Sequence, residues 1–253
     1  MPIVRADHDL EVALFEPHGS SSGPTLVLLH EGLGSVAMWR EFPERLALVT
    51  GCSVLAYSRY GYGQSEALEG PRDVRYMHDE ALSALPKLLD ALALAEPILV
   101  GHSDGASIAL ICAGAGRRPL RGVVAIAPHV IVEDCSIESI AAAQRAYEST
   151  DLRQRLARYH AHVDSAFRGW NDIWLHPDFR SWSIEEYLPR IACPVLVIQG
   201  GNDEYGTADQ VHRIARQVAN TDVLMLDHCG HSPHRDDPAA VLEAIRSFVE
   251  RVR

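Results

Sequence analysis

Short runs of consecutive apolar residues alternate along this chain with longer segments in which apolar residues recur at helical spacing. The consecutive runs are typical of strands buried on both faces of a sheet, and they cover residues 25–30, 52–57, 97–100, 121–128, 193–200 and 222–227. Helical spacing covers residues 38–49, 77–95, 207–219 and 238–252. Strands that alternate with helices predict a mostly parallel sheet with helices on both faces.

Two segments refine this pattern. Residues 8–16 alternate polar and apolar positions, which predicts an early antiparallel strand. The helix over 77–95 contains Pro86 and is expected to bend there, because proline cannot donate a backbone hydrogen bond inside a helix.

One long segment breaks the alternation. Residues 131–191 hold no strand-like run and show helical spacing, so we expect a helical cap inserted over the sheet edge, with 1–130 and 192–253 forming the core. The segment contains three of the chain's four tryptophans: Trp170, Trp174 and Trp182. Two interpretations of these side chains stay open. They line a substrate pocket from which water is excluded, or they form a small core beneath the insertion.

Size and charge limit the possible partners. A chain of 253 residues fits one α/β domain with an insertion, and its formal charge of -11 without a basic cluster argues against binding nucleic acid or an anionic membrane. Five widely spaced cysteines without a C-x-x-C pair indicate free thiols in a reducing compartment. No signal peptide or membrane span is apparent. We therefore expect a cytoplasmic monomer or homodimer that acts on a small molecule.

Candidate chemistry is centred on Ser103. An apolar run ends in Gly101-His102-Ser103-Asp104-Gly105, and a helical pattern rich in Ala and Leu follows at once. A strand that reverses directly into a helix strains the residue at the apex and brings neighbouring backbones close, so glycines are needed on either side. The serine hydroxyl would stand at the sheet edge, beside the free N–H groups of a helix N-terminus. This pattern predicts a serine nucleophile.

A serine hydroxyl needs a general base and a group that orients that base. Asp203 and His231 each follow a predicted buried strand, in the loops where the sites of parallel sheets collect. Asp203 could instead be an ordinary turn residue, and Glu204 is the alternative acid. Three histidines and one cysteine lie within residues 228–234, but their spacing does not match a zinc site, so we expect no metal.

Together these motifs resemble the α/β-hydrolase superfamily over nearly the whole chain. The resemblance rests on His30-Glu31-Gly32-Leu33-Gly34-Ser35, Arg59-Tyr60-Gly61-Tyr62-Gly63-Gln64-Ser65, Gly101 to Gly105, Asp203 and Gly230-His231-Ser232-Pro233. It implies a twisted sheet of eight strands, mostly parallel, with a helical cap. It also implies Ser103 as nucleophile, His231 as general base and Asp203 as the carboxylate that orients it. The oxyanion hole would combine the backbone N–H of Asp104 with one from the Gly32 region, and no cofactor is implied.

Two residues depart from the commonest family pattern. Asp104 stands where many relatives carry Met or Leu, and Glu31 stands where His-Gly is more usual. Each carboxylate either caps or pairs locally, or contacts a polar group of the substrate and influences His231. Because Glu31 adjoins the expected oxyanion loop, it is a candidate pocket residue together with the three tryptophans.

The resemblance predicts a serine hydrolase that cleaves a small-molecule carboxylic ester or lactone through an acyl-enzyme intermediate. Hydrolysis of a carbon–carbon bond in a ring-cleavage product and thioester hydrolysis remain open on the same fold. A serine in place of a carboxylate nucleophile argues against haloalkane dehalogenase and epoxide hydrolase mechanisms. Two alternatives belong to other classes: a non-catalytic ligand-binding protein, and a protein that binds a partner through the aromatic insertion.

Overall fold

A computed structural model describes residues 2–19 and 23–253 and is built around one eight-stranded sheet. The strands are β1 (Ile3–Arg5), β2 (Asp9–Phe15), β3 (Leu26–Leu29), β4 (Val54–Tyr57), β5 (Ile98–His102), β6 (Gly122–Ile126), β7 (Val195–Gly200) and β8 (Thr221–Leu226). Their order is β1-β2-β4-β3-β5-β6-β7-β8, and only the pairs β1–β2 and β2–β4 are antiparallel. The expected mostly parallel sheet is confirmed. The short edge strand β1 is an element that the sequence pattern did not predict.

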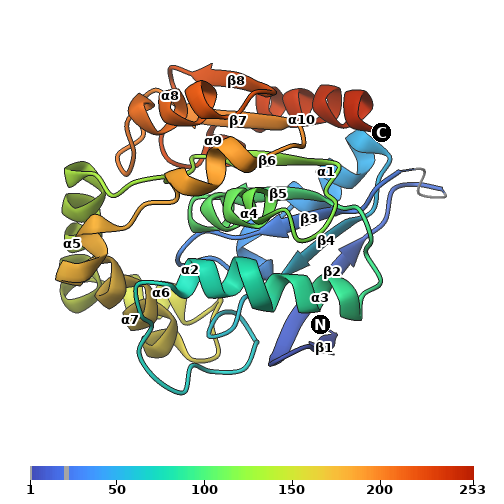
Figure 1. The fold of residues 1–253 in the computed structure, drawn as a ribbon. Coiled ribbons are helices and arrows are strands. Elements are labelled where there is room, and N and C mark those ends of the chain that lie inside the picture. The colour runs from blue at the N-terminus through green and yellow to red at the C-terminus, as the bar shows by residue number, and fades with distance from the viewer. Residues whose placement is uncertain (1, 20–22) are drawn as a thin grey trace.

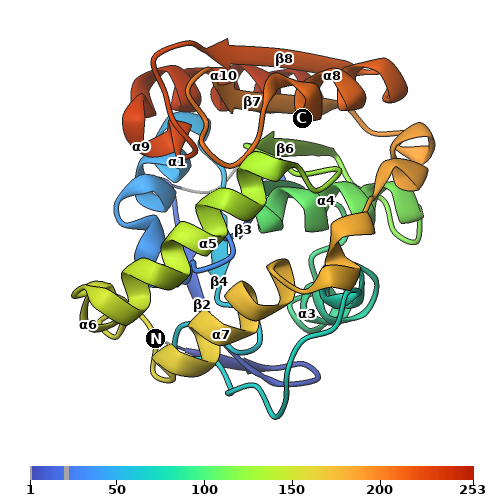
Figure 2. The same ribbon diagram turned by 90° about the vertical axis from the view of Figure 1, so that its left-hand side faces the viewer.

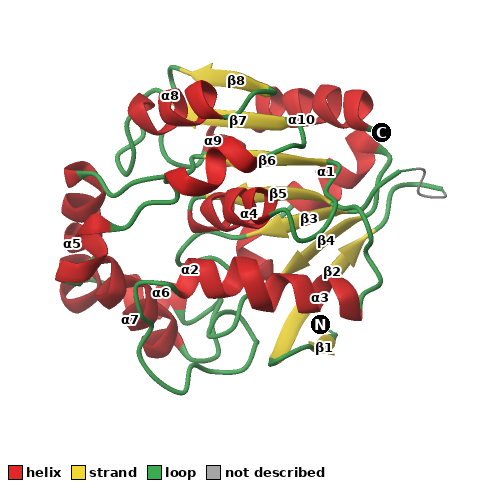
Figure 3. Cartoon of the chain, viewed as in Figure 1, coloured by secondary structure: helices red, strands yellow, loops and turns green. Residues whose placement is uncertain are grey.

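Helices cover both faces of the sheet (Figure 1; Figure 3). The α-helices are α1 (Phe42–Thr50), α2 (Tyr76–Asp79), α3 (Leu85–Ala91), α4 (Asp104–Ala115), α5 (Asp134–Ser149), α6 (Leu152–Leu156), α7 (Val163–Trp174), α8 (Ala208–Gln217), α9 (Pro233–Asp236) and α10 (Pro238–Val252). Three short 3₁₀ helices are η1 (Val36–Trp39), η3 (Pro177–Ser181) and η4 (Glu185–Arg190). Helices α1 and α10 share one core with the sheet, and α3, α4 and α8 share another on the opposite face.

The two cores follow from the twofold repeat of a strand. In β3, Leu26 and Leu28 belong to the core beneath α1 and α10, whereas Val27 and Leu29 belong to the core beneath α4. All four side chains are fully buried. This double burial explains why the parallel strands appear in the sequence as continuous apolar runs.

The helix expected over 77–95 is interrupted rather than simply bent. A π-helical turn, η2 (Glu80–Ala84), separates α2 from α3, and Pro86 stands in the first turn of α3. Proline leaves the Leu82 carbonyl without its usual helical donor. The Arg117 guanidinium, at 3.3 Å, donates to that carbonyl instead. The Leu82 carbonyl therefore accepts its hydrogen bond from Arg117, which follows the C-terminal end of α4.

The segment between β6 and β7 forms α5, α6, α7, η3 and η4. Its two ends lie side by side, because Ile131 pairs with Ser183 and the Ile184 N–H donates to the Val130 carbonyl at 2.9 Å. Figures 1 and 2 show α5 and α7 beyond the end of the sheet toward which the parallel strands run. Among the described residues, no helix has both the length and the apolar character that crossing a membrane requires.

Candidate active site

The turn at Ser103 joins β5 directly to α4. Ser103 has φ of 53° and ψ of -119°, a backbone conformation that residues other than glycine rarely adopt. A Cβ on Gly105 would collide with the carbonyl of Leu29, and one on Gly101 would collide with the carbonyl of Gly105. The close backbone approach that the sequence predicts at these glycines is therefore present. It lifts the Ser103 hydroxyl clear of the sheet edge.

Ser103, His231 and Asp203 form a continuous hydrogen-bonded chain. The Ser103 Oγ lies 2.9 Å from His231 Nε2, and His231 Nδ1 lies 2.8 and 2.9 Å from the two Asp203 carboxylate oxygens. Because a carboxylate only accepts, His231 carries its hydrogen on Nδ1 and leaves the Nε2 lone pair facing the serine hydroxyl. This is the arrangement in which an imidazole can remove the serine proton.

Asp203 is held by several donors besides His231. Its Oδ1 accepts from the N–H groups of Tyr205 (2.8 Å) and Gly206 (3.2 Å), and its Oδ2 accepts from the Gln199 amide (2.7 Å). Burial raises the pKa of the Asp203 carboxyl, but the hydrogen bonds from His231 and Tyr205 outweigh this effect and lower it overall. We did not predict Gln199. The sequence feature that could have revealed this residue is its polar side chain inside the apolar run of β7.

A cavity of about 250 Å³ opens beside the Ser103 hydroxyl. The core contributes Glu31, Gly32, Leu33, His102, Ser103, Asp104, His129, Glu204, Tyr205, His231 and Ser232, and helices α5 and α7 contribute Ile140, Trp170 and Trp174. Trp182 does not line this cavity. Its ring stacks on Phe179 and lies tilted against Trp174, behind the cavity wall. His129 is a further lining residue that we did not predict from the sequence.

The loop after β3 approaches the Ser103 turn from the other side. His30 is fully buried, and its Nε2 accepts from the Arg59 N–H (3.0 Å) while its Nδ1 donates to the Glu31 carbonyl (2.7 Å). Burial holds the pKa of His30 well below its ordinary value, so the ring is neutral and supplies both hydrogen bonds. At Gly32, a Cβ would collide with the Trp170 indole. Glycine at this position therefore lets α7 close over the loop.

A family model described as alpha/beta hydrolase family matches residues 26–244. The chain belongs to this family. It is 27% identical over 262 residues to the putative carbamate hydrolase RutD of Caulobacter sp. strain K31, covering 92% of this chain and 94% of that protein. It is 24% identical to the sn-1-specific diacylglycerol lipase ABHD11 of Xenopus laevis, covering 96% and 84%. A solved proline iminopeptidase of Mycobacterium smegmatis has the same fold, with a TM-score of 0.82 at 18% identity and coverage of 99% and 98%.

Asp104, one of the two unusual residues in this α/β-hydrolase, turns away from His231. Its carboxylate accepts from the Tyr76 hydroxyl (2.6 Å) and the Trp174 indole N–H (3.3 Å), and lies 3.7 Å from the Arg59 guanidinium. Asp104 and Arg59 are both essentially inaccessible to solvent. The buried negative charge is thus matched by one cation and two neutral donors. Through Trp174, the network ties helix α7 to the first residue of α4.

Glu31, the second unusual residue, pairs at the cavity mouth. Its two carboxylate oxygens lie 3.3 Å from the Arg235 guanidinium and 3.5 Å from His102 Nδ1. Burial raises the pKa of the Glu31 carboxyl, but His102 and Arg235 outweigh it and hold the pKa well below its ordinary value. The Nε2 of His102 also donates to the His231 carbonyl at 2.8 Å. Glu31 and His102 together connect the loop after β3 to the His231 loop.

The histidine side chains of segment 228–234 point to different surroundings. His228 reaches Asp237 at 3.1 Å, His231 faces Ser103, and His234 packs against Trp39 and Phe42. Across residues 2–19 and 23–253, no three His, Cys, Asp or Glu side chains are grouped to hold a metal ion. The close sequence spacing of these side chains therefore does not become a shared site.

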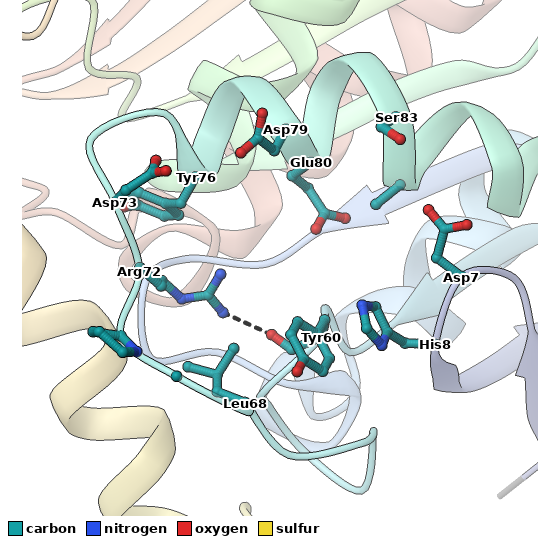
Figure 4. A pocket seen from close by; sticks show the side chains of 13 residues that line it. Asp7, His8, Tyr60, Leu68, Arg72, Asp73, Tyr76, Asp79, Glu80 and Ser83 are labelled. Carbon is teal, nitrogen blue, oxygen red and sulfur yellow. Dashed lines mark hydrogen bonds between the residues drawn. The ribbon is translucent and has the colours of Figure 1, made fainter.

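A second cavity, of about 350 Å³, lies beside α2 (Figure 4). Figure 4 shows Arg72 reaching across it to the Tyr60 carbonyl, a hydrogen bond of 2.6 Å. Within the part of the chain that the structure describes, its one serine (Ser83) and its one histidine (His8) share no hydrogen bond. Tyr76 separates the two cavities, because its ring lines this one while its hydroxyl contacts Asp104. The paired serine and histidine belong to the smaller cavity alone.

Proposed function

We propose that this protein is a serine hydrolase that cleaves small-molecule carboxylic esters or lactones. The observation that carries the proposal is the unbroken hydrogen-bonded chain from Ser103 through His231 to Asp203, which opens into a cavity lined by both apolar and polar side chains. A protein that only binds a ligand has no physical need to align these three groups. Residues 131–191 serve as a cap in this proposal, because Trp170 and Trp174 roof the serine.

The reaction follows from the positions of the polar atoms. Ser103 Oγ attacks the substrate carbonyl while His231 Nε2 takes the hydroxyl proton, and Asp203 stabilises the imidazolium that forms. The negative oxygen of the tetrahedral intermediate accepts from the backbone N–H of Asp104 and from one in the Gly32 region. Collapse breaks the bond to the leaving oxygen, which takes the proton from His231. Water then attacks the acyl-enzyme with His231 again as base, and releases the acid and free Ser103.

The cavity favours compact, uncharged substrates. Its volume of about 250 Å³ is small for a ligand pocket, since pockets for drug-sized molecules run from roughly 300 Å³ upward. Leu33, Ile140 and the two indoles supply apolar surface, whereas Glu31, Asp104 and Glu204 are the acidic residues of the wall. The carboxylates of Glu31 and Glu204 repel an anionic substrate by Coulombic interaction, which solvent moderates at the exposed Glu204 and Arg235 moderates at Glu31. A neutral ester or lactone avoids that cost.

A carbamate is the second candidate substrate. The observation that favours it is the similarity, at 27% identity, to a protein named as a putative carbamate hydrolase. The same machinery would form a carbamoyl-enzyme and release an alcohol, which takes its proton from His231. Water would then release a carbamic acid, which loses carbon dioxide to leave the amine. The five free cysteines support the expected location in a reducing compartment.

The test combines labelling with a substrate screen. A fluorophosphonate probe should label the wild-type protein and fail to label Ser103→Ala. Ser232→Ala is the matched control, because Ser232 lines the same cavity without a hydrogen bond to His231, and it should still be labelled. Hydrolysis rates for 4-nitrophenyl esters of increasing chain length, γ- and δ-lactones, thioesters and carbamates then rank the substrate classes. Equal labelling of Ser103→Ala, or no turnover in any class, would overturn the proposal.

A further inference from the structure

His129 is a buried side chain of the active-site cavity that acyl transfer does not use. It follows β6, is 2% exposed and lines the cavity beside Ser103. Its backbone is fixed by Ser107, whose hydroxyl donates to the His129 carbonyl (2.6 Å) and accepts from the His129 N–H (3.2 Å). None of the described residues hydrogen-bonds to its Nδ1. The ring is thus held firmly while its own polar atoms are left unused.

The surroundings keep this imidazole neutral. Burial, together with the smaller effect of the nearby His231, lowers the pKa of His129 to about 3. The His129 ring lies 5.7 Å from the ring of His231 and 5.1 Å from the Trp174 indole. A neutral neighbour leaves His231 free to become positively charged during the reaction. It also means that His129 offers one N–H and one lone pair.

The N–H can be assigned to one nitrogen from the packing. Nδ1 is buried near Gly206 without an acceptor, so a hydrogen there would be an orphaned donor. With the hydrogen on Nε2, the His129 ring has its N–H donor on the side opposite the buried Nδ1. A phenylalanine would fill the same space without the cost of desolvating an imidazole. The chain therefore keeps a polar ring in the cavity wall that the folded protein itself does not satisfy.

We propose that His129 donates a hydrogen bond to a second oxygen atom of the substrate, separate from the scissile ester group. The inference rests on the proposed hydrolase function and narrows its substrate to acyl compounds that carry a keto, hydroxy or ether oxygen near the reacting carbonyl. The short distance between the His129 and His231 rings places that oxygen within about three to five bonds of the carbonyl carbon, given a hydrogen bond of about 2.9 Å.

His234 is a second buried histidine, and its position differs from that of His129. Both ring nitrogens of His234 also lack partners in the described part of the chain, and the residue is 3% exposed. However, His234 lies against Trp39, Phe42 and His102 and lines no cavity that holds Ser103. A ligand can reach His129 and cannot reach His234. His234→Phe is therefore the matched control for His129→Phe.

The experiment uses two pairs of 4-nitrophenyl esters, pentanoate with 4-oxopentanoate and hexanoate with 5-oxohexanoate. Within each pair the added keto group is remote from the ester, so intrinsic reactivity is nearly equal, and rates of alkaline hydrolysis correct the remainder. We expect the wild-type kcat/KM to favour one keto ester by about tenfold over its partner, the discrimination that one well-placed hydrogen bond supplies. His129→Phe should bring that ratio close to one, and His129→Gln should restore part of it.

The ratio of the two kcat/KM values within a pair distinguishes a loss of substrate recognition from a general loss of activity. A common loss of rate on both esters of a pair cancels in the ratio, and His234→Phe should keep the wild-type ratio. A wild-type enzyme that hydrolyses both pairs without preference, or a preference that survives in His129→Phe, would overturn the role of His129. Either result leaves the hydrolase function standing, since that is judged by the loss of all ester turnover in Ser103→Ala.

Discussion

Two buried carboxylates flank Ser103, and their partners give them different roles. Asp203, in the loop after β7, accepts from His231, Gln199 and two backbone N–H groups. Asp104, the first residue of α4, accepts from Tyr76 and Trp174 and lies beside Arg59. Apart from His231, the donors to Asp203 are neutral, so its charge acts on that imidazole. The charge of Asp104 is already matched by a buried guanidinium.

The difference shows that proximity to the nucleophile does not decide what a carboxylate does. Asp104 is adjacent to Ser103 in the sequence, yet its side chain faces α2 and α7. Asp203 is 100 residues away in the sequence and reaches Ser103 through one imidazole. We infer that Asp203 serves the reaction and that Asp104 anchors the cap.

Replacing Asp203 by Asn should cost roughly 10⁴-fold in kcat, because the amide can favour the imidazole tautomer that presents N–H to the serine. The free energy of unfolding should change less than in Asp104→Asn, since no buried arginine loses its counter-charge. Steady-state kinetics on the best ester from the screen and urea denaturation measure the two quantities. A variant that keeps more than a tenth of wild-type kcat would contradict the role of Asp203.

Asp104→Asn should lower the free energy of unfolding by about 3 kcal/mol, because it removes the carboxylate that pairs with the buried Arg59 guanidinium at 3.7 Å. Its kcat should fall less than tenfold, since the backbone N–H of residue 104 is unchanged. Tyr76→Phe is the matched control. It removes one donor to the carboxylate and keeps the ion pair, and should cost about 1.5–3 kcal/mol. The comparison fails if Asp104→Asn is as stable as wild type and loses activity as severely as Asp203→Asn.

The acid dependence of stability should differ slightly between wild type and Asp203→Asn. The pKa of Asp203 is lower in the folded protein than its ordinary value of 3.8, so the carboxylate adds stability above about pH 4 that is lost as pH falls through the folded pKa. Each unit of that lowering corresponds to about 1.4 kcal/mol. Urea denaturation at pH 6, 4 and 3 should show the wild type losing this contribution and Asp203→Asn lacking it. Ser103→Ala keeps the carboxylate and should follow the wild type.

Local patterns in the sequence were enough to predict the sheet and the turn at Ser103. The apolar runs give the strands without reference to distant neighbours. The tight turn needs Gly101 for its own backbone, whereas Gly105 is also needed because the Leu29 carbonyl of β3 approaches it. Asp203 and His231 were predicted because they follow strands whose ends must meet at one sheet edge. Their order along the chain also matches the family.

The remaining features depend on contacts between distant elements. The partners of Asp104 come from α2 and α7, and the Trp174 indole is 70 residues away in the sequence. The sequence leaves open whether Trp174 and Trp182 line a pocket or form a core beneath the insertion, because which one faces the cavity depends on how residues 131–191 pack. The contacts that Gln199 and His129 make depend on strand register and loop position. A pattern of single residues does not contain that information.

Acylation of Ser103 is the central claim, and mass spectrometry tests it directly. Wild-type protein is mixed with 4-nitrophenyl acetate, quenched in acid within the first turnover and measured intact, then digested to locate any adduct. We expect an added acetyl group on the peptide that contains Ser103, and no adduct in Ser103→Ala. Turnover of the ester without a covalent adduct, or an adduct of equal yield in Ser103→Ala, would contradict it.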